Sequence, residues 1–130
     1  MAKYWFGHIH LFSPEPTKTA QFYEKMFSAK VLTTRKSPDG RLNVDLDLGG
    51  LRLLVAERPA GREAMPSRSE VRLGLEHFGI ETDNIEAAVT ELKAKGVEFR
   101  DEIRLVRPGV KVAFIWGPEN VLIELVERKE

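Results

Sequence analysis

Three side chains of this sequence have the types that bind divalent metals, and two of them recur at matching places. His8 and His77 each stand just before the end of the first predicted strand in their half, and Glu124 lies mid-strand among apolar neighbours. Because a buried carboxylate is costly without a partner, Glu124 requires a cation or a metal. Imidazole and carboxylate together suit Zn, Ni, Mn, Co or Fe(II). We therefore expect these three residues to bind one divalent metal ion, with coordination positions left open for a substrate oxygen or for O₂.

Polar side chains share one face of the predicted hairpin formed by residues 42–48 and 51–57. Side chains alternate between the two faces of a strand, so each strand divides into two sets. One set is entirely apolar, whereas the other contains Asp45, Asp47 and Arg52. We expect these three residues to line a wet cavity or groove that binds substrate. A solvated outer face is the alternative.

The first predicted strand, residues 4–12, places aromatic and imidazole side chains on one face. These are Phe6, His8, His10 and Phe12. Phe6 and Phe12 are expected to contact a substrate. His10 has three open roles, as a second ligand of the metal, as an acid or base beside it, or as a polar wall residue. We assign His10 and Glu124 as the catalytic residues, with His10 as an acid or base.

The last predicted hairpin, residues 111–116 and 121–127, divides by the same alternation. Phe114 and Trp116 are expected on an apolar face that packs under the helices, together with Ile123. Glu124 is expected on the opposite face.

These side chains belong to an internal repeat. The pattern of strand, helix and three strands occurs twice, as a first module of about residues 4–57, a linker of about 58–71 and a second module of about 72–127. The predicted fold class is α+β, with two βαβββ modules in a single domain of residues 1–130 whose curved mixed sheets enclose a metal-site cavity. Each half is too small to bury its own sheet, so the halves pack together or pair with a second chain. We expect a homodimer.

Short local signals mark the ends of the predicted elements. Ser13-Pro14-Glu15 begins the first helix, and Asp83 with Glu86 forms a capping box for the second. Gly49-Gly50 predicts a two-residue hairpin turn, and Gly96 ends the second helix.

Composition narrows the class of function. The 130 residues include 20 basic and 20 acidic side chains, so the net charge is zero and no basic excess calls for nucleic acid or an anionic membrane. The sequence has no cysteine, which excludes thiolate chemistry and disulfides. No signal peptide or membrane-spanning stretch is evident, so we expect a cytoplasmic protein that binds a small molecule.

Three segments resemble the vicinal oxygen chelate superfamily, which includes glyoxalase I, bleomycin resistance proteins and extradiol dioxygenases. They are HIHLFSPEPTKTAQFYEKMFSAKV (8–31), HFGIETDNIEAAVTELKAKGVEF (77–99) and WGPENVLIELVE (116–127), and together they cover both halves. The resemblance places His8, His77 and Glu124 at the family's metal positions. At the fourth position, where glyoxalase I and the epimerases usually have Glu or Gln, this sequence has Leu54, and Glu57 is the nearest carboxylate.

The resemblance implies chemistry in which a metal acts as a Lewis acid on neighbouring oxygens of the substrate. The leading hypothesis is a metal-dependent, glyoxalase-like lyase or isomerase that acts on a small vicinally oxygenated substrate, with His10 or a metal-bound water as the base. One alternative is an extradiol-type dioxygenase that uses the same three ligands on Fe(II). The other is a metal-free protein that binds or sequesters a small molecule, as in bleomycin resistance.

Overall fold

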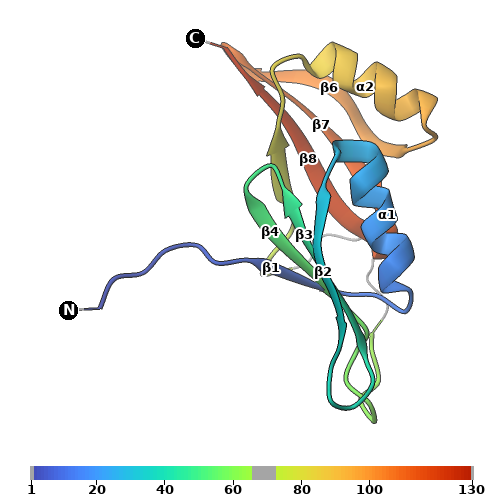
Figure 1. The fold of residues 1–130 in the computed structure, drawn as a ribbon. Coiled ribbons are helices and arrows are strands. Elements are labelled where there is room, and N and C mark those ends of the chain that lie inside the picture. Colours follow the sequence, from blue (N-terminus) through green and yellow to red (C-terminus); the bar gives the residue numbers. More distant parts are fainter. Residues whose placement is uncertain (1, 66–72, 130) are drawn as a thin grey trace. The chain divides into compact units, whose positions relative to one another are not determined.

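The computed structural model describes residues 2–65 and 73–129, which form two compact units with the same order of elements (Figure 1). The first unit contains β1 (Ile9–Phe12), α1 (Pro16–Phe27), β2 (Lys30–Lys36), β3 (Leu42–Leu48) and β4 (Leu51–Ala56). The second contains β5 (Phe78–Glu81), α2 (Ile85–Ala94), β6 (Glu98–Arg107), β7 (Val110–Gly117), a 3₁₀ turn (Pro118–Asn120) and β8 (Val121–Arg128). Part of the expected linker, and residue 72 at the start of the expected second module, lie outside the described residues.

Each unit has one four-stranded mixed sheet, with the strand order β1-β4-β3-β2 in the first and β5-β8-β7-β6 in the second. The sheets are mixed because β1 runs parallel to β4 and β5 runs parallel to β8, whereas all other neighbours are antiparallel. In both units the first strand therefore lies beside the last. The predicted α+β class with two βαβββ modules is confirmed.

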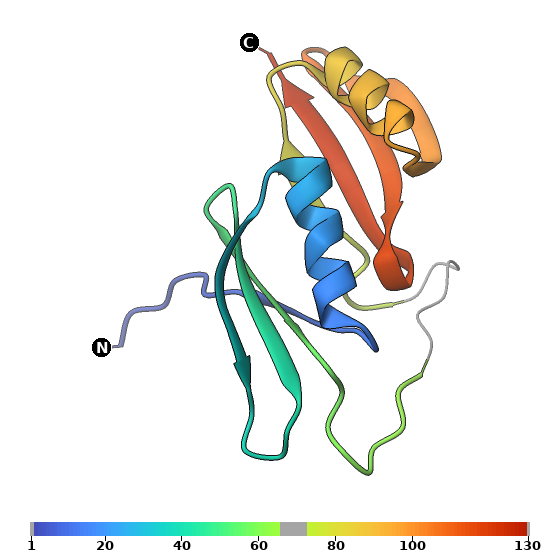
Figure 2. The same cartoon turned by 45° about the vertical axis from the view of Figure 1, so that its right-hand side comes forward.

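One helix covers one face of each sheet. In the first module, α1 packs on β3 and β4, as Figure 2 shows, and Ala20 and Tyr23 are buried there. In the second, α2 buries Ile85, Val89 and Leu92 against β6, β7 and β8. Burial of these apolar faces is the main stabilising contribution to each module. The face opposite the helix is left to carry the polar and chemically active side chains.

The predicted division of faces is correct in the first module. Asp45 is opposite Leu54 and Asp47 is opposite Arg52, so these residues share a face, whereas Leu46 is opposite Leu53 on the other. The turn between β3 and β4 consists of the predicted glycine pair, both at positive φ. Glycine adopts this conformation without strain.

The predicted division of faces is wrong in the second module. Gly117 is opposite Val121, so the turn contains three residues and Phe114 is opposite Glu124. A shift of one residue moves every side chain of a strand to the other face. Phe114 and Trp116 therefore lie on the same face as Glu124, and not under the helix as expected.

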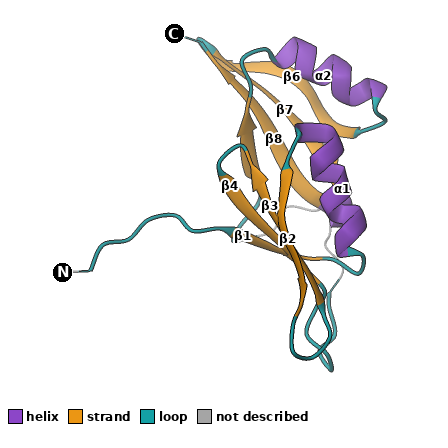
Figure 3. Ribbon diagram, in the orientation of Figure 1, coloured by secondary structure: helices purple, strands orange, loops and turns teal. Residues whose placement is uncertain are grey.

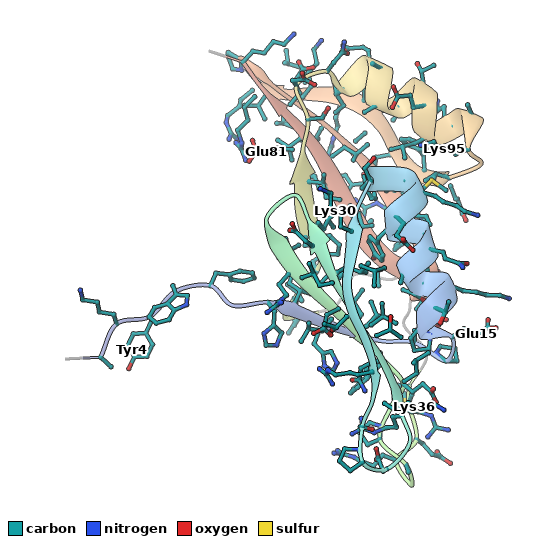
Figure 4. The ribbon with its side chains drawn as sticks, in the orientation of Figure 1. Tyr4, Glu15, Lys30, Lys36, Glu81 and Lys95 are labelled. Atoms are coloured by element: carbon teal, nitrogen blue, oxygen red, sulfur yellow. The ribbon has the colours of Figure 1, made fainter. Side chains whose placement is uncertain are left out.

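The first strand of each module is shorter than predicted. β1 begins at Ile9 and not at residue 4, and β5 begins at Phe78 and not at residue 73. The residues before β1 form a loop in Figure 3, and Tyr4 lies on it away from the sheet in Figure 4. His8 and His77, which were expected inside a strand, therefore each come directly before one, whereas His10 lies within β1.

The helices begin slightly later than the sequence signals predicted. Glu15 is the N-cap of α1 and Pro16 is its first residue, so Ser13 instead hydrogen-bonds Thr19. The side chain of Asn84, and not Asp83, caps α2 by accepting a hydrogen bond from the Ala87 amide at 3.0 Å. Among the described residues, no helix is long and apolar enough to cross a membrane.

Candidate metal site

The second module brings two of the three predicted metal ligands together. His77 Nε2 lies 3.6 Å from Glu124 Oε1, and the two side chains are 30% and 23% exposed. This distance is too long for a direct hydrogen bond. Two donor atoms that each lie about 2.1 Å from one metal ion are roughly 3.0–3.5 Å apart at octahedral or tetrahedral angles. The pair therefore fits a shared divalent ion with little movement.

The second nitrogen of His77 also has a partner. Nδ1 lies 3.2 Å from Oε1 of Glu76. A carboxylate that accepts a hydrogen bond from one imidazole nitrogen fixes the tautomer and leaves the other nitrogen as a donor to a metal. Glu76 therefore orients His77 so that Nε2 faces Glu124.

Apolar side chains surround Glu124. Val112, Phe114, Leu122 and Val126 form a buried cluster on its face of the sheet, with Val110 and Trp116 packed against it. The ring of Phe114 contacts His77 edge-on, with centroids 5.2 Å apart. These groups limit the access of water to one side of the pair, which strengthens electrostatic interactions there.

Arg100 supplies a positive charge close to this pair. Its guanidinium lies over the Phe114 ring, 4.7 Å from the centroid, on the ring that also contacts His77. Arg100 also donates to Asp101 Oδ2 at 2.8 Å, and this hydrogen bond lowers the pKa of Asp101. A cation at this place is suited to an anionic group on a bound molecule.

The first module holds the other two histidines. His8 is exposed and directly precedes β1, whereas His10 lies within β1. The His10 ring contacts Phe12 edge-on with centroids 5.0 Å apart. Partial burial, followed by electrostatic repulsion from His8, lowers the pKa of His10. The neutral imidazole that results near pH 7 can accept a proton or bind a metal.

Leu54 occupies the place in the first module that Glu124 occupies in the second. Each is the fourth residue of the last strand of its module. Glu57, the nearest alternative carboxylate, accepts a hydrogen bond from the Leu42 amide through Oε1 at 3.2 Å. Glu57 therefore secures the open end of the β3–β4 hairpin. Among residues 2–65 and 73–129, no three His, Cys, Asp or Glu side chains form a ready metal-binding group.

The three polar residues predicted to contact substrate have different environments. Asp45 is mostly buried, and its Oδ1 lies 3.7 Å from Arg35 Nη2 without a hydrogen-bond partner. Asp47 Oδ1 accepts a hydrogen bond from the Gly50 amide at 2.9 Å, so it stabilises the hairpin turn. Arg52 is exposed. Asp45 is the one whose unsatisfied oxygen is suited to a ligand.

The two predicted aromatic contacts are largely exposed. Phe6 is 71% exposed in the loop before β1, and Phe12 is 49% exposed at the end of β1. Phe12 is held by the sheet and by the His10 ring, so it has a defined position.

Sequence reasoning missed Glu76 and Arg100. Glu76 directly precedes a predicted ligand, and an acid next to a candidate histidine is a signal that could have identified it. Arg100 gives no such signal because its relation to Phe114 depends on the pairing of β6 with β7, which contains bulges on both sides of Asp101.

The sequence also matches a known family. The model of the Glyoxalase/Bleomycin resistance protein/Dioxygenase superfamily matches residues 5–125. This range spans both modules and includes His8, His77 and Glu124. The chain belongs to this superfamily, as the resemblance implied.

Curated relatives include enzymes of two kinds. Mitochondrial methylmalonyl-CoA epimerase of Homo sapiens is 29% identical over 126 residues, covering 92% of this chain and 71% of the epimerase. Lactoylglutathione lyase of Schizosaccharomyces pombe is 27% identical over 143 residues, covering 99% of this chain and 47% of the lyase. The chain therefore spans about half the length of that lyase.

Solved structures share the fold over nearly the whole chain. A glyoxalase family protein from Enterococcus faecalis is 27% identical with a TM-score of 0.73, and the match covers 95% of this chain and 97% of that one. A mutant of the fosfomycin resistance protein FosX from Listeria monocytogenes, in complex with Mn(II) and a dihydroxypropylphosphonic acid, has a TM-score of 0.70 at 20% identity, with 95% and 92% coverage. The latter similarity shows the fold alone.

Proposed function

We propose that this protein is a metal-dependent lyase or isomerase of the glyoxalase type that acts on a small vicinally oxygenated molecule. His8, His77 and Glu124 bind one divalent metal ion in this proposal. The observation that carries it is the 3.6 Å separation of His77 Nε2 and Glu124 Oε1 beside an apolar cluster. Two donor atoms at this separation can bind one divalent ion with little movement, and the family to which the chain belongs includes metalloenzymes.

The residues of the chain have separate tasks in this proposal. A bound metal would act as a Lewis acid toward oxygens of the substrate. Glu76 holds His77 in the tautomer that leaves Nε2 free to bind. Phe114 excludes water beside the pair, and Arg100 attracts an anionic group of the substrate.

Side chains of the first module complete the proposed substrate contacts. Asp45 offers a buried carboxylate oxygen, and Phe12 offers an aromatic face next to His10. Arg52 is exposed on the same face of the sheet and adds a second positive charge. Asp47 supports these contacts by stabilising the turn between β3 and β4. Phe6 offers a second aromatic side chain, from the loop before β1.

The names of the curated relatives favour a lyase or isomerase over ring cleavage. An epimerase and a lyase match over most of this chain at 29% and 27% identity. A Lewis acid and a base would suffice for proton transfer of the lyase or isomerase type. Ring cleavage on Fe(II) and metal-free binding are the alternative outcomes of the two tests below.

The first test is elemental analysis of protein purified without an affinity tag or added metal. We expect close to one divalent ion per chain in the wild type and in the control Glu102→Gln, which changes an exposed carboxylate paired with Lys93. We expect loss of that ion in His77→Ala and Glu124→Gln. If the wild type binds no metal even after loading with Fe(II), Mn, Co, Ni and Zn, the proposed metalloenzyme is wrong. The remaining hypothesis is then a metal-free binding protein with the same fold.

The second test is activity of the metal-loaded protein. Methylmalonyl-CoA and the hemithioacetal precursor of lactoylglutathione represent the two kinds of relative. Turnover of either, lost in His77→Ala and retained in Glu102→Gln, is the expected result. Cleavage of a catechol panel by the Fe(II) form alone, with loss of activity in air and recovery with reductant, would replace the proposal by the dioxygenase.

A further inference from the structure

Strand β6 contains a bulge beside the candidate metal site of the second module. Phe99 is in register with Ile115 of β7. Two residues further along β6, Asp101 is in register with Phe114, which is only one residue away on β7, so Arg100 is an extra residue. Neighbouring side chains of a regular strand point to opposite faces, whereas at a bulge two residues oppose one residue of the other strand. Arg100 and Asp101 therefore both oppose Phe114.

The contacts of Arg100 agree with this geometry. Its Nη2 donates a hydrogen bond to Asp101 Oδ2 at 2.8 Å, and its Nε donates to the same oxygen at 3.3 Å. The guanidinium carbon lies 4.7 Å from the centroid of the Phe114 ring, within the range of a cation–π interaction. The bulge thus directs Arg100 over the ring that the His77 imidazole contacts edge-on.

One edge of the Arg100 guanidinium is left for a ligand. A guanidinium group binds a carboxylate or a phosphate through two parallel N–H groups along one of its edges. Asp101 occupies the edge formed by Nε and Nη2. Within residues 2–65 and 73–129, Nη1 has no hydrogen-bond partner, so the edge formed by Nη1 and Nη2 is open. The Arg100 side chain is 31% exposed, so a small molecule can reach this edge.

The charges around Arg100 favour an anion. Arg104 is in register with Val112, which belongs to the same apolar cluster as Phe114, so both arginines lie on one face of the sheet. The hydrogen bond from Arg100 and the charges of both arginines lower the pKa of Asp101, which is therefore ionised at neutral pH. Two arginines and one aspartate leave one positive charge.

We propose that Arg100 is a specificity-determining residue that binds a carboxylate or phosphate group of the substrate, so that the substrate of this site is an acid. Asp101 positions the guanidinium group. The substrate spans the Phe114 ring, with its anionic group at Arg100 and its vicinal oxygens at His77 and Glu124. This inference rests on the proposed function, to which it adds the class of substrate.

Hydroxamic acids test this class of substrate, because a hydroxamate offers two neighbouring oxygens to a metal. The probes are the monohydroxamates of malonic, succinic and glutaric acid, their uncharged methyl esters, and phosphonoacetohydroxamate. Three chain lengths are used because the distance from Arg100 to a bound metal sets the length that fits. Isothermal titration calorimetry measures the affinity of each probe for the Zn(II)-loaded protein. We expect the wild type to bind at least one free acid at least about 10-fold more tightly than its ester.

Three variants separate the guanidinium group from its charge. Arg100→Gln removes both, Arg100→Lys keeps the charge without the paired N–H groups, and Arg104→Gln removes an equal charge from the same face of the same strand. The preference for acid over ester should fall to about 2-fold or less in Arg100→Gln and to an intermediate value in Arg100→Lys. In Arg104→Gln it should change by less than about 2-fold. The acid whose affinity falls most in Arg100→Gln identifies the group as carboxylate or phosphate.

The affinity for the ester is the internal control. It should be the same in all four proteins, because a variant that only disturbed the fold would weaken the binding of acid and ester alike. Arg100 is partly exposed, so its variants should fold.

Several outcomes would overturn the inference. No preference for an acid in the wild type, or the same preference in Arg100→Gln, would exclude the role of Arg100, and the proposed function would stand if Zn(II) were still bound and were lost in His77→Ala. Equal losses in Arg100→Gln and Arg104→Gln would show a general attraction of charge and not binding by Arg100. A wild type that binds no Zn(II) would overturn the proposed function and this inference with it.

Discussion

The phenol of Tyr23 is fully buried between α1 and the first sheet, and burial raises its pKa. The phenol of an unfolded chain titrates near pH 10. Above that pH the unfolded state loses its proton before the folded state does, so unfolding releases a proton and stability falls as the pH rises. Below about pH 10 the contribution of Tyr23 to the free energy of unfolding should not depend on pH.

Urea unfolding between about pH 9 and about pH 11 measures this dependence. We expect the free energy of unfolding of the wild type to decrease over this range more steeply than that of Tyr23→Phe. The comparison uses the slopes, because the substitution also changes the stability at neutral pH. Equal slopes for the two proteins would contradict the prediction.

The sequence alone identifies a functional residue where the type of that residue conflicts with its neighbours along the chain. Glu124 was identified because a charge in the middle of an apolar strand requires a partner, and His77 because it matches His8 in the repeat. Arg100 gives no comparable signal, and Glu76 gives only a weaker one, as an acid next to a candidate histidine. Their relation to Glu124 and His77 depends on strand register and side-chain rotamers, which the sequence does not encode locally.

At the level of elements, Glu127 connects the end of β8 to the start of α2. Glu127 is only 3% exposed, and its Oε2 accepts a hydrogen bond from the Ile85 amide at 2.8 Å. The first amides of a helix have no partner within the helix, and the helix dipole favours a negative charge there. We expect Glu127→Ala to lower the free energy of unfolding by about 1–3 kcal/mol, since a buried amide loses its acceptor.

Glu127→Gln is the matched control for this prediction. The amide oxygen of Gln retains the acceptor for the Ile85 amide and loses only the charge. Chemical denaturation at pH 7 should give a smaller loss of stability for Glu127→Gln than for Glu127→Ala. Equal losses would show that the charge, which also lies 3.6 Å from Lys129 Nζ, is responsible instead.

Whether the two faces of a hairpin can be predicted from the sequence depends on whether the sequence fixes the length of its turn. The glycine pair fixed a two-residue turn between β3 and β4, so the division of faces in that hairpin was predicted correctly. Residues 117–120 contain a proline but no such constraint on turn length. One more residue of pairing at Gly117 was enough to place Phe114 beside Glu124 and not under α2.

At the level of the whole molecule, we expect a homodimer. Each sheet has two edge strands, and of these β2 and β6 each expose a pair of large apolar side chains. These are Val31 and Leu32 on β2 and Leu105 and Val106 on β6. Exposed apolar side chains on an edge strand favour association with another chain.

Sedimentation equilibrium tests the expected dimer. The wild type should have twice the 14.8 kDa mass of the chain. Leu32→Lys and Leu105→Lys place a charge on an edge strand, and at least one should shift the protein toward the mass of one chain. A wild type that is monomeric at all concentrations would contradict the expectation.

The order of elements in the whole molecule was the most predictable property, because both modules repeat the same hydrophobic periods and turn signals. The single domain of residues 1–130 stays a prediction, since each module is compact by itself. A fourth ligand is the least predictable property, because Leu54 has no donor atom at the position that Glu124 occupies in the second module.

Gly79 of β5 is in register with Glu124 of β8, and His10 of β1 is in register with Leu54 of β4, which has a consequence for the choice of metal in the cell. Nitrogen donors favour Zn, Cu, Ni and Fe, whereas carboxylates favour Mn and Mg. Residues in register on neighbouring parallel strands point to the same face, so exchanging the two residues of such a pair would move a donor side chain from one strand to the other without rebuilding the sheet. Descendants of one duplicated module could therefore adapt to a change in metal supply by substitutions at this pair, while the rest of the site stays as it is.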